Sequence, residues 1–205
     1  DLRRLNRYLG GTRSIMDHLL PRMMFMDDAA TVLDIGTGDA SLPLAIARHT
    51  IDHNMTTRVI GLDIMPRHLT IARQRVGDYR HIALLQGDAL HLPYADDSVD
   101  FVICSLLMHH FTREQVIQFL QEAYRCARVA IIMSDLVRGW LPYLGFKLIQ
   151  PIFNLHPFTR QDGEVSIMRG FTPAELEDIA QQAGLPHATL HKHLMFRMTL
   201  VAEKS

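Results

Sequence analysis

Three short segments of the sequence combine a carboxylate with small residues in a pattern that suits a bound nucleoside. The first is Asp34-Ile35-Gly36-Thr37-Gly38, whose two glycines let the chain turn tightly and approach a ligand that a side chain would obstruct. The second ends at Asp63, whose two oxygens can accept hydrogen bonds from a ribose diol. The third is Gly87-Asp88-Ala89. A glycine turn alone also ends many strands for steric reasons, so only the whole series is specific.

A second kind of chemistry is suggested by the adjacent histidines His109 and His110. Imidazole titrates near neutral pH, so either side chain can remove a proton from a hydroxyl group. The alternative is that one histidine packs against or caps the next helix while the other faces solvent. We take His109 and His110 as the candidate catalytic residues.

To act together, these residues require a fold that brings distant segments of the chain to the same edge of a β-sheet. Short β-branched runs alternate with helical periodicity, which predicts an α/β fold with a doubly wound, mostly parallel sheet. The tail predicts two closing strands that pair antiparallel, for a Rossmann-like sheet of seven strands. The expected strands are residues 31–35, 58–62, 81–85, 99–104, 129–134, 188–194 and 197–202, and the expected helices are 42–48, 66–76, 114–127 and the one that begins after Thr172.

In such a sheet ligands bind beyond the carboxyl ends of the strands, which is where the three segments and the two histidines fall. The 205 residues are expected to form one domain. Its expected parts are a helical N-terminal cap (1–28), a ligand-binding core (29–135), an apolar insertion that forms a lid (136–170), and a final helix with closing strands (171–205).

Composition excludes several classes of protein. The chain has 21 Lys plus Arg against 22 Asp plus Glu, a net charge of -1 that supplies no overall attraction to nucleic acid or anionic lipid. Cys104 and Cys126 stand apart and suggest neither a disulfide framework nor a zinc site, which favours a cytoplasmic protein. No P-loop is present, and Ser41 interrupts the dinucleotide-binding glycine pattern. No run approaches the ~20 apolar residues of a membrane span.

The series of motifs resembles the class I S-adenosylmethionine-dependent methyltransferase family. Residues 32–38 are similar to its first motif, 61–63 to its second and 86–89 to its third, and 92–100 resemble the stretch that leads into its fourth strand. Ala40 departs from the pattern, since many members have a further glycine there. The implied cofactor is S-adenosylmethionine, and no metal is expected.

The resemblance also implies roles for individual residues. Gly36 and Gly38 would lie under the methionine part of the cofactor, with Asp34 near its amino group and Asp63 on the ribose hydroxyls. Asp88 and the Ala89 N–H would meet the adenine, which Ile64 and Leu90 would sandwich. The implied cofactor-binding residues are Asp34, Gly36, Thr37, Gly38, Asp63, Ile64, Asp88, Ala89, Leu90 and Ser105.

The residues after the fourth strand narrow the choice of methyl acceptor. Cys104-Ser105-Leu106-Leu107 lacks the Pro-Pro-Tyr pattern of enzymes that methylate nucleic-acid bases, and it lacks the carboxylate of the metal-dependent catechol type. The insertion offers an apolar wall from Trp140, Tyr143, Phe146, Ile149, Phe153 and Phe158, and cationic groups from Arg138, His156, Arg160 and Arg169. The same stretch could instead pack on the sheet or form a homodimer contact.

We therefore expect methyl transfer to a hydroxyl of a small aromatic or apolar acceptor, with no nucleic-acid partner. A weaker similarity to bacterial methyltransferases of secondary metabolism supports this choice. The alternatives are carbon methylation of a quinone or polyketide precursor, a cofactor-binding regulatory subunit without turnover, and an RNA methyltransferase.

Overall fold

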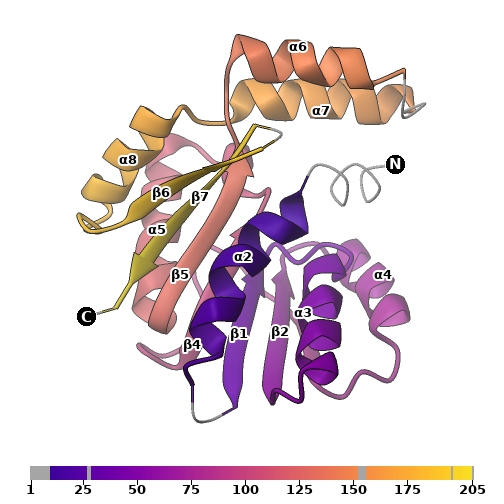
Figure 1. The fold of residues 1–205 in the computed structure, drawn as a ribbon, viewed down its shortest axis with the longest axis vertical. Coiled ribbons are helices and arrows are strands. Elements are labelled where there is room, and N and C mark those ends of the chain that lie inside the picture. The colour runs from indigo at the N-terminus through magenta and orange to yellow at the C-terminus, as the bar shows by residue number, and fades with distance from the viewer. Residues whose placement is uncertain (1–9, 27–28, 152–155, 195, 205) are drawn as a thin grey trace.

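The computed structural model describes residues 10–26, 29–151, 156–194 and 196–204, which form a seven-stranded sheet with helices on both faces (Figure 1). The expected N-terminal cap lies partly outside these residues, and so does Phe153 of the expected apolar wall. The strands are β1 (Ala30–Ile35), β2 (Thr57–Asp63), β3 (Ile82–Gln86), β4 (Val99–Ser105), β5 (Ala127–Leu136), β6 (Thr189–His193) and β7 (Arg197–Glu203).

The strand order β3-β2-β1-β4-β5-β7-β6 confirms the predicted doubly wound sheet. Strands β1 to β5 pair in parallel, while β7 runs antiparallel to both β5 and β6, which confirms the closing antiparallel pair. The chain reverses its direction of travel along the sheet between β3 and β4. The carboxyl ends of β1 and β4 are therefore neighbours, and this switch point is where ligands bind in such folds.

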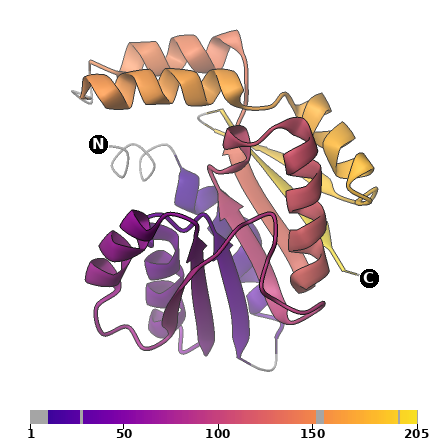
Figure 2. The same cartoon turned by 180° about the vertical axis from the view of Figure 1, so that it is seen from behind.

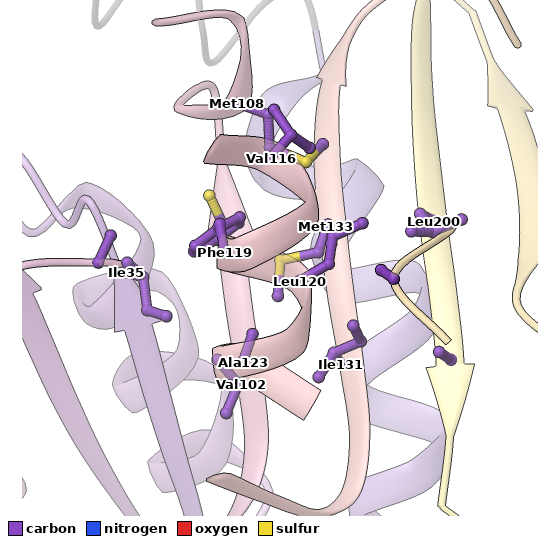
Figure 3. Packing of buried hydrophobic residues seen from close by; sticks show 14 of the residues in the cluster. Ile35, Val102, Met108, Val116, Phe119, Leu120, Ala123, Ile131, Met133 and Leu200 are labelled. Carbon is purple, nitrogen blue, oxygen red and sulfur yellow. The ribbon is translucent and has the colours of Figure 1, made fainter. Parts of the chain in front are cut away.

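The helices pack on the sheet in two groups. Buried residues of α2, α3 and α4 form one apolar cluster with one face of the sheet, and those of α5 and α8 form a second cluster with the other face. Figure 3 shows the second cluster, in which Phe119 and Leu120 of α5 pack near Met133 of β5. The helices are α2 (Gly11–Met23), α3 (Ser41–Asp52), α4 (Pro66–Val76), the 3-10 helix η1 (Met108–His110), α5 (Arg113–Cys126), α6 (Trp140–Ile149), α7 (Pro157–Arg169) and α8 (Pro173–Gln182).

Local sequence explains where two of these helices begin. Thr112 and Gln115 form a capping box at the start of α5, because each side chain bonds to the other residue's backbone N–H. Thr172 and Glu175 form the same arrangement before α8, followed by Pro173 in its first turn. Cys104 and Cys126 are free and buried, and burial raises the pKa of both thiols. Both cysteines therefore act as small core residues.

The insertion expected at residues 136–170 contains two helices, α6 and α7. Helices α6 and α7 lie side by side and cross beyond the carboxyl ends of the parallel strands (Figures 1 and 2). Phe146 of α6 is buried against Gly163 of α7, where the absence of a side chain leaves room for the ring. The insertion is therefore a helical hairpin with its own small contact surface.

Candidate active site

The loop after β1 is tied to the end of β2 by backbone hydrogen bonds. The N–H groups of Gly36 and Thr37 donate to the carbonyl oxygen of Leu62 at 2.8 and 3.0 Å, and the Gly38 N–H donates to Asp63 Oδ2 at 2.9 Å. Gly36 and Gly38 have φ of 71° and 57°, in the left-handed region that favours glycine. The motif thus needs both glycines for its own turn, and the side of Gly38 that a Cβ would occupy is open.

Asp63 and Asp88 each hold the turn that follows them. Asp63 Oδ1 accepts the Met65 N–H at 2.9 Å, and Asp88 Oδ1 accepts the Leu90 N–H at 2.9 Å. Each also meets a histidine: His68 Nδ1 lies 3.2 Å from both oxygens of Asp63, and His91 Nδ1 lies 3.0 Å from Asp88 Oδ2. The Leu90 N–H and His91 lower the pKa of Asp88.

Because His68 already contacts both carboxylate oxygens of Asp63, a ribose diol at the same oxygens has to displace this half-exposed imidazole. The two turns therefore preorganise the carboxylates, and the contact with His68 adds a competing partner. The sequence motifs did not indicate the contact between His68 and Asp63.

Three buried polar atoms at the switch point between β1 and β4 have no hydrogen-bond partner among the described residues: Asp34 Oδ2, Ser105 Oγ and Thr37 Oγ1 of the loop after β1. Asp34 and Ser105 belong to the strands themselves. Burial raises the pKa of Asp34 to about 7, the nearby Thr37 hydroxyl opposes this shift, and the charge of Asp63 adds to it. Buried polar groups are normally paired, so unpaired ones at the mouth of a sheet indicate a polar ligand. The ammonium and carboxylate of an amino-acid ligand suit Asp34 and Ser105.

Three further members of the expected cofactor set follow the ends of β2 and β3. Ile64 is 58% exposed, Leu90 is half-buried and Ala89 is buried. Exposed apolar side chains at a strand end are available to stack on a flat ring. That Ile64 and Leu90 sandwich an adenine stays a prediction.

The histidine pair lies beyond β4, and the structure separates its two members. His109 is buried, and its Nδ1 lies 2.7 Å from Asp135 Oδ1 at the end of β5. Asp135 is also buried and accepts the backbone N–H groups of His109 at 3.1 Å and Leu136 at 2.7 Å. A carboxylate accepts hydrogen bonds only, so His109 donates through Nδ1 and keeps Nε2 as its basic nitrogen.

His110 is exposed and has a different environment. Its ring centroid lies 4.2 Å from that of His109, and no carboxylate holds it as Asp135 holds His109 among the hydrogen bonds of the described residues. Burial of part of the ring and the neighbouring His109 lower its pKa, while Asp135 and Asp162 of α7 raise it. Of the two expected catalytic histidines, His109 has the geometry of an oriented base.

Asp135 is a residue of the candidate site that the sequence analysis did not single out. It lies 26 positions after His109 in the chain. The signal was available, since Asp135 ends the strand that pairs with β4, and adjacent parallel strands bring their carboxyl ends together. Arg197 of β7 is buried nearby; burial lowers its pKa to about 10 and Asp135 opposes that shift.

The backbone between β4 and η1 is strained. Leu106 has φ of 62°, a conformation that costs a bulky residue about 1 to 2 kcal/mol. Its N–H donates to Ser134 of β5 at 3.0 Å, and the following Leu107 packs over Gly36. Strain of this kind persists where the surrounding structure holds it, often at functional sites. In this chain, the conformation of Leu106 places Leu107 between the glycine loop and His109.

The insertion approaches the same edge through α7, which contacts η1. Of the expected cationic groups, Arg138 pairs with Glu175 of α8, and Arg169 acts electrostatically on His110. Trp140 does not line an enclosed wall, since it is 84% exposed. The described helices include none long and apolar enough to cross a membrane.

Known proteins with similar sequences are methyltransferases. Residues 32–129 match a family model described as a methyltransferase domain. Demethylmenaquinone methyltransferase of Bacillus licheniformis is 36% identical over 83 residues, which cover 40% of this chain but only 34% of that protein. The enzyme of the same name from Listeria monocytogenes is 26% identical over 189 residues, 84% of this chain and 76% of that protein.

A solved structure of a SAM-dependent methyltransferase from Aquifex aeolicus has the same fold. It superposes with a TM-score of 0.67 at 16% identity and covers 99% of this chain and 98% of its own. In the present chain the loops that follow β1, β2 and β4 carry a glycine turn, a carboxylate held by backbone N–H groups, and buried polar atoms at the switch point. The matched domain, the curated relatives and the shared fold together support a class I S-adenosylmethionine-dependent methyltransferase.

Proposed function

We propose that the protein transfers the methyl group of S-adenosylmethionine to a hydroxyl group of a small aromatic or apolar acceptor, with His109 as the general base. The observation that carries this proposal is the buried contact of 2.7 Å between His109 Nδ1 and Asp135 Oδ1. A histidine held by a buried carboxylate at the end of β4 is arranged to take a proton.

The chain's own residues handle the proton. When bound, the sulfonium of the cofactor supplies an electrophilic methyl carbon. His109 would take the proton of the acceptor hydroxyl on Nε2 and pass it to water. Asp135 keeps the ring in the Nδ1–H tautomer and stabilises the imidazolium that forms.

Cofactor binding is assigned to the residues expected from the sequence. Asp63 is proposed to take the ribose after His68 moves away, and Asp34 and Ser105 to meet the amino-acid part. Asp88, Ala89, Leu90 and Ile64 are proposed to surround the adenine. Much of the rate enhancement then comes from alignment, since methyl transfer is an in-line displacement.

A second candidate is methylation at carbon. The relatives that match this chain are named demethylmenaquinone methyltransferase, which favours a quinone-like acceptor. An acceptor carbon activated by a neighbouring hydroxyl needs the same proton removal, so His109 and Asp135 serve either reaction. The two candidates differ only in which acceptor atom faces the sulfur.

The test is an assay with methyl-labelled S-adenosylmethionine and a panel of phenols and hydroquinones. We expect label in a small molecule, and nuclear magnetic resonance of the product distinguishes O-methyl from C-methyl. Label in RNA or protein alone would refute both candidates. Cofactor binding by calorimetry without transfer to any fraction of a cell extract would indicate a regulatory subunit.

A further inference from the structure

Helix α6 presents an apolar face to solvent. Trp140, Leu141, Leu144 and Leu148 are 84%, 72%, 53% and 65% exposed. At 100° per residue these four positions span one side of the helix, while the buried Phe146 lies on the side that packs against α7. Scattered exposed apolar residues are ordinary, but a contiguous set on one helix marks an interaction surface.

The turn between β6 and β7 extends this face. A Cβ on Gly145 would lie 2.9 Å from the ring of Phe196, so the turn packs against α6. Phe196 is 41% exposed, and Leu194 two positions earlier is 90% exposed. Phe196 has φ of 59°, so this large side chain is kept at a strained position. The outer apolar surface is Trp140, Leu141, Leu144, Leu148, Leu194 and Phe196.

The charged residues of α6 and of residues 189–199 are all positive. Lys147 is the only charged residue of α6, and Lys192 and Arg197 are the only charged residues from Thr189 to Thr199. Lys147 and Lys192 are exposed, whereas Arg197 is buried. The chain as a whole has a net charge of -1, so the cationic character is local to this surface.

Lys147 is also placed at the border of the surface. Its ammonium lies 4.8 Å from the centre of the Tyr143 ring, and Trp140 meets the same ring edge-on at 6.1 Å. Glu164 of α7 acts on Lys147, but its carboxylate accepts hydrogen bonds from Gln150 and Tyr143. An apolar face with an aromatic residue and a lysine at its edge is the pattern of a helix that lies in a membrane interface.

We propose that the outer apolar surface docks on the surface of a bilayer that contains anionic phospholipid. The apolar side chains enter the boundary between headgroups and acyl chains, while Lys147 and Lys192 meet the phosphates. A second copy of the chain fits less well, because a two-fold interface places the same surface, with its positive charges, against itself. This docking requires neither the proposed acceptor nor turnover.

The chain contains one tryptophan, Trp140, which reports directly on this surface. Purified protein is mixed with vesicles of equimolar phosphatidylglycerol and phosphatidylcholine, and with vesicles of phosphatidylcholine alone, without cofactor or acceptor. We expect a blue shift of the emission, quenching by brominated acyl chains, and sedimentation with the anionic vesicles. Leu144→Asp is expected to weaken the apparent affinity by roughly tenfold or more, and Lys147→Gln by up to about fivefold.

Ile51→Asp is the matched control, because Ile51 is 52% exposed on α3 and lies outside the surface. This variant should bind vesicles as the unaltered chain does, and circular dichroism verifies that each variant is folded. Equal binding to neutral and anionic vesicles, or no binding to either, overturns the proposal. A blue shift that grows with protein concentration in the absence of vesicles overturns it in favour of self-association.

Discussion

The rim that is assigned to the cofactor and the side that is assigned to the acceptor are built in opposite ways. The rim consists of the turns after β1, β2 and β3, where Asp63 and Asp88 bond to N–H groups two residues away. The acceptor side depends on His109 and Asp135, which lie on different strand ends, and on an insertion that exposes Trp140. Local bonds suit a ligand shared by a whole family, whereas contacts between distant segments can change with the acceptor.

The largest effect is expected on the acceptor side. His109→Gln should lower kcat by about 10² to 10⁴-fold, because the hydroxyl proton loses its oriented base. The cofactor affinity, measured by calorimetry, should stay unchanged, since His109 is assigned no cofactor contact. His110→Gln is the matched control and should retain most of the activity. Equal losses in the two variants would remove the distinction between the two histidines.

The next effect concerns how the protonation of Asp34 changes the stability of the folded protein. Asp34 has a pKa of about 7 in the folded chain against an ordinary 3.8, so folding takes up a proton between these pH values. The contribution of Asp34 to the free energy of unfolding should therefore fall by about 1.4 kcal/mol for each pH unit as the pH rises across this window, and level off above it. In the Asp34→Asn variant this dependence should be absent.

Urea unfolding of the cofactor-free protein measures this difference. Asp34→Asn should be more stable than the unaltered chain above the folded pKa of about 7, and the gap should close toward the ordinary pKa of 3.8. A gap that does not change with pH would show that Asp34 is not the titrating group.

The third prediction tests the carboxylate assigned to the ribose. Asp63→Ala should weaken cofactor binding by about 1 to 3 kcal/mol through loss of charged hydrogen bonds. Asp63 also accepts the Gly38 and Met65 N–H groups, so part of the loss comes from a looser loop. Calorimetry gives the affinity and circular dichroism gives the fold. An unaltered affinity would take Asp63 out of the site.

The smallest effect is expected from the residue that competes at the same carboxylate. His68→Ala should tighten cofactor binding by up to about fivefold, the equivalent of an exposed ion pair of about 0.2 to 1 kcal/mol. Weaker binding in this variant would mean that His68 contacts the cofactor instead of competing with it.

Strand and helix positions were predicted closely where local signals were strong. The predicted helix at residues 66–76 agrees with α4, and the capping pattern at Thr172 marks the start of α8. The two helices of the insertion at residues 136–170 were not predicted, because an apolar run has the same composition in one helix or two. The pairing of His109 with Asp135 was missed because it depends on the register of β4 against β5.

The sequence by itself determined the alternation of strands and helices, the glycine turn and the carboxylates that come after the strands, because each depends on backbone conformation within a few residues. Only the tertiary structure decided which histidine is held by a carboxylate, which imidazole competes at Asp63, and which side of α6 faces solvent. These features depend on contacts between segments far apart in the chain. Local preference does not specify such contacts, which form only when the packed sheet brings the segments together.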